Sequence, residues 1–179
     1  DNFEMRELSL ALPSPNLPNT PFADLSLTHP FIWATYSERQ AIVNNINQLE
    51  WAKSIFYQMK ARVDGIKDEH KINPQTYLNT IPALPGVISN RTAHNEVLEI
   101  ASESAILYYL TNDNDYAQLA GDVLSHYTDR LALVDTVNIR RGYFFDDWWL
   151  ESRSVYPRIG ICYDFLYNFL NQKMQLLKF

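Results

Sequence analysis

Apolar side chains recur every three or four positions along four stretches of the chain, between segments rich in proline, glycine and short polar residues. This spacing places the apolar side chains on one stripe of a helix. It predicts helices over residues 35–63, 93–110, 115–133 and 151–170, the first with a kink near Leu49–Trp51 and an end at Asp64–Gly65. No run of alternating apolar and polar residues predicts a strand. We therefore predict an all-α fold.

The segments between these helices indicate how the helices are arranged. Residues 1–34 contain five prolines, which fix the backbone and remove hydrogen-bond donors, so we expect an extended lead-in there. Thr35 and Glu38 have the spacing of a capping box that starts the first helix. Residues 111–113 form a short turn, and helices joined so closely pack antiparallel. We expect longer irregular connections over 67–91 and 134–151, and one helical domain over 35–179.

Composition and charge limit the possible partners. The 179 residues are 46% hydrophobic, 20% charged and 13% aromatic, enough for one ordinary core with many flat side chains. The net charge of −6, with Arg140–Arg141 as the longest basic cluster, argues against binding to nucleic acid. No apolar run has the length of a membrane span, so we expect no membrane partner. The single cysteine, Cys162, excludes an internal disulfide and fits a buried position.

The stretch 142–170 carries the most chemistry in the chain. Trp148 and Trp149 follow two aspartates, and Arg153 and Tyr156 lie one helical turn apart on one face of the helix that follows. Flat rings beside charged groups suit a sugar, and a guanidinium with a phenol suits a uronate carboxylate. We predict that these four residues bind substrate, with one tryptophan packed in the core and the other facing a cleft. Burial of both rings as core anchors is the alternative.

The acidic and histidine residues allow both catalytic and structural interpretations. Asp146, Asp147 and Glu151 could supply the acid and base of a glycosidase, or be acids that a helix N-terminus favours. Asp164 fits a structural hydrogen bond that ties the helix to a loop. His94 and Asn95 could contact a substrate, or belong to the capped first turn of their helix. The four histidines lack paired helical spacing and no glycine-rich phosphate loop occurs, so we expect neither a metal nor a cofactor.

Several segments together resemble the N-terminal helical domain of heparinase II/III-like polysaccharide lyases, a bacterial family that includes alginate and oligo-alginate lyases. The resemblance spans residues 29–170, with Glu50 where the family commonly has proline and Asn112 where it has the glycine of a hairpin turn. The residues that carry it are the segments 29–32 and 37–39, Trp51–Lys53, Ala105–Asp113 with Tyr116–Ala117, and Ile159–Tyr167. It implies antiparallel helical hairpins forming part of an incomplete (α/α) toroid that is followed by β-sandwich domains.

The resemblance also implies a function. We expect the N-terminal part of a periplasmic or secreted lyase that cleaves an acidic, uronate-containing glycan by β-elimination. The catalytic residues, unassigned here, are expected downstream of this chain, whose own part is one wall of the substrate cleft. The remainder of the same enzyme, toroid and β-sandwich, is the expected partner. Two alternatives stay open: an (α/α)-barrel glycoside or unsaturated-uronyl hydrolase, and a non-catalytic helical module that binds glycan or acts as a scaffold.

Overall fold

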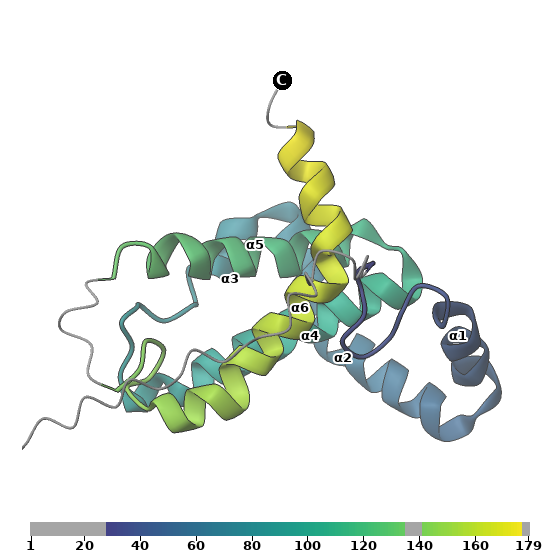
Figure 1. Ribbon diagram of the computed structural model, residues 1–179, viewed down its shortest axis with the longest axis horizontal. Helices are drawn as coiled ribbons and strands as arrows, with labels where there is room; N and C mark the ends of the chain where they lie inside the picture. The colour runs from purple at the N-terminus through teal and green to yellow at the C-terminus, as the bar shows by residue number, and fades with distance from the viewer. Residues whose placement is uncertain (1–27, 135–140, 177–179) are drawn as a thin grey trace, which may run out of the picture.

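A computed structural model describes residues 28–134 and 141–176, with side chains up to residue 172 (Figure 1). Within these ranges the regular structure is helical and no strand is present, which confirms the all-α class. The helices are α1 (Arg39–Gln48), α2 (Glu50–Ile72), α3 (Pro74–Leu78), α4 (Arg91–Thr111), α5 (Asn114–Leu131) and α6 (Trp148–Leu176), with a 3-10 turn at Ile88–Asn90. Most of the lead-in predicted over 1–34, and part of the loop predicted over 134–151, lie outside the described residues. The toroid stays a prediction.

Helix α4 is the centre of the fold. It packs most extensively against α5 and α6, and also contacts α1 and α2. The predicted hairpin of α4 and α5 turns at Asn112, which has a left-handed backbone with φ of 60°. Asparagine tolerates this conformation, which explains how it replaces glycine there. Asp113 then caps α5 by accepting a hydrogen bond from the backbone N–H of Asp115.

Small side chains let the two helices of this hairpin approach closely. Ala101 and Ala105 of α4, and Ala117 and Ala120 of α5, are completely buried. Larger buried side chains fill the space around them, among them Leu98, Leu107, Leu119, Tyr127 and, from α6, Val155 and Leu166. The core therefore lies where α4 is covered by α5 on one side and by α6 on another, and α6 crosses the hairpin in Figure 1.

The beginning of the helical domain differs from the sequence prediction. The structure has two helices that meet at Leu49, where the predicted kink is a complete break. The predicted end at Asp64–Gly65 is wrong, because α2 continues to Ile72. Its later turns gain contacts that offset the modest cost of a helical glycine: Lys71 Nζ donates a hydrogen bond to Asp115 Oδ2 at 2.6 Å, and Lys67 Nζ lies 4.6 Å from the centre of the Tyr116 ring.

The segment before α1 is tied to the end of α4. The Tyr109 hydroxyl donates a hydrogen bond to the carbonyl of Thr35 at 2.7 Å, and Arg39 donates to the carbonyls of Tyr109 and Leu110. The carbonyls of a last helical turn lack partners within their helix, so a guanidinium is a favourable neighbour for them. Glu38 accepts hydrogen bonds from the backbone N–H and hydroxyl of Thr35, which is one half of the predicted capping box. The predicted start of the helix at residue 35 is wrong, because α1 begins at Arg39 and its N-cap, Glu38, has no side-chain cap. In the described part of the chain no helix is both long and apolar enough to cross a membrane.

Candidate functional site

Trp148 and Trp149 form the first turn of α6, which begins three residues earlier than predicted. Both side chains are exposed, with 62% and 57% of their surface accessible. Their rings are perpendicular, with centroids 5.9 Å apart. The expectation that one of them packs in the core is therefore wrong. Position in the first turn explains this, because the preceding loop, and not the indoles, fills the core beside α6.

The aspartates before these tryptophans start the helix. Asp147 accepts a hydrogen bond on its side chain from the backbone N–H of Leu150 at 3.1 Å, and its carbonyl accepts the first helical hydrogen bond, from Glu151, at 2.9 Å. This is the geometry of an N-cap. Asp146 is exposed and has a left-handed backbone with φ of 60°. The structural interpretation of Asp147 accounts for its contacts.

Glu151 is completely buried and holds the loop that precedes α6. Its Oε1 accepts hydrogen bonds from the backbone N–H groups of Phe144 and Phe145 at 2.9 and 2.8 Å, and its Oε2 accepts one from Tyr143 at 2.9 Å. Gly142 makes this possible: a Cβ atom there would lie 2.4 Å from Glu151 Oε1, and its φ of 155° also favours glycine. The backbone of the loop thus occupies the Glu151 carboxylate, which is not free to contact a substrate.

Asp164, thirteen residues further along α6 and also buried, does the same for the segment before α1. Its Oδ2 accepts the backbone N–H groups of Phe31 and Ile32 at 2.9 and 2.8 Å, and its Oδ1 lies 2.6 Å from His29 Nδ1. The His29 ring stacks on Tyr167 at 3.9 Å between centroids. The structure therefore supports the structural interpretation of Asp164, which joins residues more than 130 positions apart.

His94 is buried and Asn95 is half-buried, both in the first turn and a half of α4. The His94 ring is completely buried, and its Nδ1 lies 2.9 Å from the Tyr127 hydroxyl. Burial lowers the pKa of His94 to about 4, against a smaller opposite effect of the Glu151 charge, so the ring is neutral near pH 7. Nε2 of His94 and Oδ1 of Asn95 are buried without a hydrogen-bond partner among the described residues.

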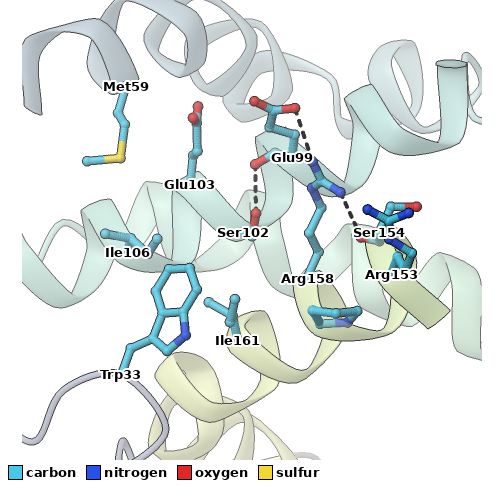
Figure 2. Close-up of a pocket in the computed structure, with 11 residues that line it drawn as sticks. Trp33, Met59, Glu99, Ser102, Glu103, Ile106, Arg153, Ser154, Arg158 and Ile161 are labelled. Atoms are coloured by element: carbon cyan, nitrogen blue, oxygen red, sulfur yellow. Dashed lines mark hydrogen bonds and ion pairs between the residues drawn. The ribbon is translucent and has the colours of Figure 1, made fainter. Parts of the chain in front are cut away.

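The side chains of Arg153 and Tyr156 have different surroundings, although the two residues lie one turn apart on α6. Arg153 is exposed and lines a groove, and in the described part of the chain it makes no ion pair (Figure 2). The Tyr156 hydroxyl lies 3.4 Å from Glu151 Oε2, and its ring meets Phe144 edge to face at 6.2 Å. Burial, together with the charge of Glu151, raises the pKa of Tyr156. Tyr156 thus belongs with the loop 142–147, and Arg153 with the groove.

The groove that Arg153 lines has a volume of about 440 Å³ and runs between α2, α4, α6 and the segment before α1. Figure 2 shows Trp33 beside Ile106 and Ile161 at its apolar end. Two acids, Glu99 and Glu103, line the polar end and are already paired, Glu99 with Arg158 at 3.4 Å and Glu103 with Arg62. Trp33, which is 65% exposed, is not among the residues predicted to bind substrate. Trp33 ends a run of three large apolar residues, 31–33, and this run is the signal in the sequence that could have identified it.

Neither a metal site nor a reactive thiol is found in the described part of the chain. In the described ranges, no group of three histidine, cysteine or acidic side chains is placed to hold a metal ion. Cys162 is buried as predicted, and burial raises the pKa of its thiol. A thiol held protonated in this way is a poor nucleophile.

Comparison with known proteins adds one relationship. No family model matches the sequence, and no solved structure matches it. The chain is 37% identical over 156 residues to an endo-acting ulvan lyase from Formosa agariphila. This match includes 82% of the present chain but only 18% of that lyase, so the chain spans less than a fifth of the length of its relative. The helical segment described above is therefore similar to one part of a much longer polysaccharide lyase.

Proposed function

We propose that this chain is part of a polysaccharide lyase that cleaves a uronate-containing glycan by β-elimination. Its similarity to an ulvan lyase supports this proposal and makes ulvan the first substrate to test. The chain contributes one wall of the substrate cleft, with Trp148, Trp149, Arg153 and Tyr156 as its binding residues. The same proposal includes helical hairpins that continue into a toroid, a β-sandwich that follows it, and a periplasmic or secreted location.

The exposed pair of tryptophans carries the assignment of the cleft wall. Two exposed indoles in contact with each other form a continuous apolar patch, and such a patch marks an interaction site more often than a single exposed ring does. An indole offers a broad apolar face together with one N–H donor. A sugar ring matches this combination, because it has apolar C–H faces and hydroxyl edges. Arg153 adds a positive charge four residues further along α6, suited to a uronate carboxylate.

The proposed reaction needs a base, an acid and neutralisation of the carboxylate. The base removes the proton at C5 of the uronate, beside the carboxylate. The bond between C4 and the glycosidic oxygen breaks, its electron pair leaves with that oxygen, and the acid protonates the leaving oxygen. A double bond between C4 and C5 remains in the product. The buried state of His94, Glu151 and Asp164 supports a binding role for this segment and a place for the proton-transfer groups elsewhere in the enzyme.

The test uses the complete enzyme that contains this chain, with ulvan as substrate. A lyase releases products with the ultraviolet absorbance of the unsaturated uronate, whereas a hydrolase releases reducing ends without it and a binding module releases nothing. Replacing both Trp148 and Trp149 by alanine is expected to lower kcat/KM about tenfold, the value of one or two lost ring contacts. Single alanine variants of Arg153 and Tyr156 test the other two residues.

The matched control is Trp51→Ala, because Trp51 is equally exposed but lies in the first turn of α2. Its kcat/KM is expected to stay unchanged. Unchanged kinetics in the double tryptophan variant, Arg153→Ala and Tyr156→Ala together would remove the cleft assignment.

A further inference from the structure

The exposed face of α6 carries an aromatic side chain at every seventh position. Trp149, Tyr156 and Tyr163 are 57%, 44% and 49% exposed. Seven residues are nearly two turns of an α-helix, so the three rings lie on one face, with a drift of about 20° per step. The distance between successive rings along the axis is about 10 Å. We call these three residues the α6 aromatic row.

A perpendicular contact with a neighbouring ring holds each member of the row. The ring centroids are 5.9 Å apart for Trp148 and Trp149, 6.2 Å for Phe144 and Tyr156, and 5.7 Å for Tyr163 and Tyr167, with angles of 83° to 88° between the planes. Such contacts fix the rings before any ligand arrives. Less side-chain entropy is then lost on binding than with freely rotating rings.

The surface between the rings is open and carries a positive charge. Gly160 lies between Tyr156 and Tyr163 on this face, and a Cβ atom placed there would have nothing within 4 Å. Arg153 lies between Trp149 and Tyr156, is exposed, and makes no ion pair within the described ranges. A ligand lying along α6 would therefore meet a ring, a guanidinium, a ring, an open space and a ring in succession.

The chemistry of the exposed positions favours a glycan over another helix as the occupant. Seams between helices are built mainly from leucine, isoleucine and valine. The exposed positions of α6 from residue 148 to 172 contain none of these and no methionine; they are Trp148, Trp149, Ser152, Arg153, Tyr156, Pro157, Tyr163, Asn168 and Gln172. Rings with polar tips and amides remain in contact with water at little cost and hydrogen-bond to hydroxyl groups when bound.

We propose that the α6 aromatic row binds a linear acidic glycan along the axis of the helix, one disaccharide per ring. The spacing of the rings is close to the length of two linked sugar rings, so every second sugar meets an aromatic face. Arg153 pairs with an acidic group between the first two rings. This proposal rests on the proposed function and extends the binding surface from Tyr156 to Tyr163, toward the end of α6 that extends beyond the other helices (Figure 1).

The first experiment measures the affinity of the 179-residue chain for ulvan oligosaccharides of two, four, six and eight sugars by titration calorimetry. The affinity is expected to rise up to six sugars and then to level off, because three rings are available. Tyr163→Ala is expected to lower the affinity for six sugars about five- to tenfold, the range of a lost aromatic contact, while the affinity for two sugars stays unchanged.

Gly160 provides a second experiment that removes no ring. Gly160→Gln places a side chain in the open space between Tyr156 and Tyr163, and is expected to weaken binding of six sugars at least as much as Tyr163→Ala. Gly160→Ala is the matched control, because it brings the same change of backbone preference with a single methyl group. It is expected to bind like the wild type.

The outcomes separate this proposal from the proposed function. If the wild type binds ulvan oligosaccharides and neither Tyr163→Ala nor Gly160→Gln changes the length dependence, the row is not a binding site, and the cleft wall at Trp148 and Trp149 stands. If the wild type binds no oligosaccharide of any length, the row is not a binding site, and the proposed function is decided separately by the kinetics of the complete enzyme. If Tyr163→Ala changes the oligomeric state, the face packs against a second copy of the chain, and the row is not a glycan site.

Discussion

The two sides of α6 carry similar chemistry and use it in opposite ways. On the buried side, the Glu151 carboxylate accepts hydrogen bonds from the backbone N–H groups of segment 143–145. The Asp164 carboxylate accepts them from the backbone of segment 31–32 and also pairs with the His29 ring. On the exposed side, Trp149, Arg153 and Tyr163 reach solvent. The residue types that suggest acid–base catalysis are thus structural, and those that suggest core packing are available to a ligand. Burial, and not residue type, decides which groups of this helix can act on a substrate.

Removal of the Glu151 carboxylate is expected to have the largest effect on stability. Glu151→Ala leaves the buried N–H groups of Phe144 and Phe145 and the N–H of Tyr143 without their acceptor, so we expect a loss of about 4 kcal/mol in the free energy of unfolding. Urea denaturation measures it. Arg153→Ala, two residues away on the exposed side, is the control, with an expected change below about 0.5 kcal/mol. Equal stability of the two variants would show that the two sides of α6 do not differ as described.

His94 extends the comparison to pH, because it is a buried group that titrates. Its pKa is about 4 in the folded protein, against about 6.5 in the unfolded chain. The unfolded state binds more protons between these values, so the contribution of His94 to stability is complete above pH 6.5 and falls by about 3 kcal/mol as the pH drops to 4. His94→Asn removes the titration, and its unfolding free energy should depend less on pH in this window. Parallel pH profiles for both proteins would show that the folded pKa of His94 is not lowered.

Substitutions at two glycines test the contrast between the buried and exposed sides of α6 without removing any functional group. Gly142→Ala would drive a methyl group into the Glu151 carboxylate at a backbone φ that disfavours alanine, so we expect a loss of about 2 kcal/mol. Gly160→Ala meets open space within a helix and is expected to stabilise the protein by roughly 0.5–1 kcal/mol. Thermal unfolding of both variants measures the difference. Shifts of the same sign would contradict the assignment of Gly142 to the buried side and Gly160 to the exposed side.

The helices could be predicted because their apolar stripes are local information. The turn at Asn112 and the start of α5 at Asp113 follow from short-range backbone and side-chain preferences, and both occur as expected. The end of α2 could not be predicted in this way. Gly65 is a local stop signal, but Lys67 and Lys71, which follow it, contact Tyr116 and Asp115 of α5. These residues are more than forty positions away in the sequence, and their contacts stabilise the turns of α2 beyond the glycine.

The candidate site was predicted in part for the same reason. The four selected residues lie on the first turns of α6, but the prediction that one tryptophan is buried is wrong, and Arg153 and Tyr156 have different surroundings. The loop 142–147 fills the core with Phe144 and Phe145, which no periodicity in so short a segment could reveal. Trp33 was missed because its neighbours in the groove come from α2, α4 and α6.

The sequence by itself determined the all-α class, the hairpin of α4 and α5, and the concentration of rings and charges around α6, because helical periodicity and turn preferences act within a few residues. Only the tertiary structure decided which of those rings and charges face water. Glu151, Asp164 and His94 became internal because distant backbone groups and rings surround them, and burying a polar group is tolerated only where such partners satisfy most of its hydrogen bonds. No distant segment among the described residues covers Trp148 and Trp149, and Tyr163 stays half exposed beside the ring of His29, so these rings can still meet a ligand.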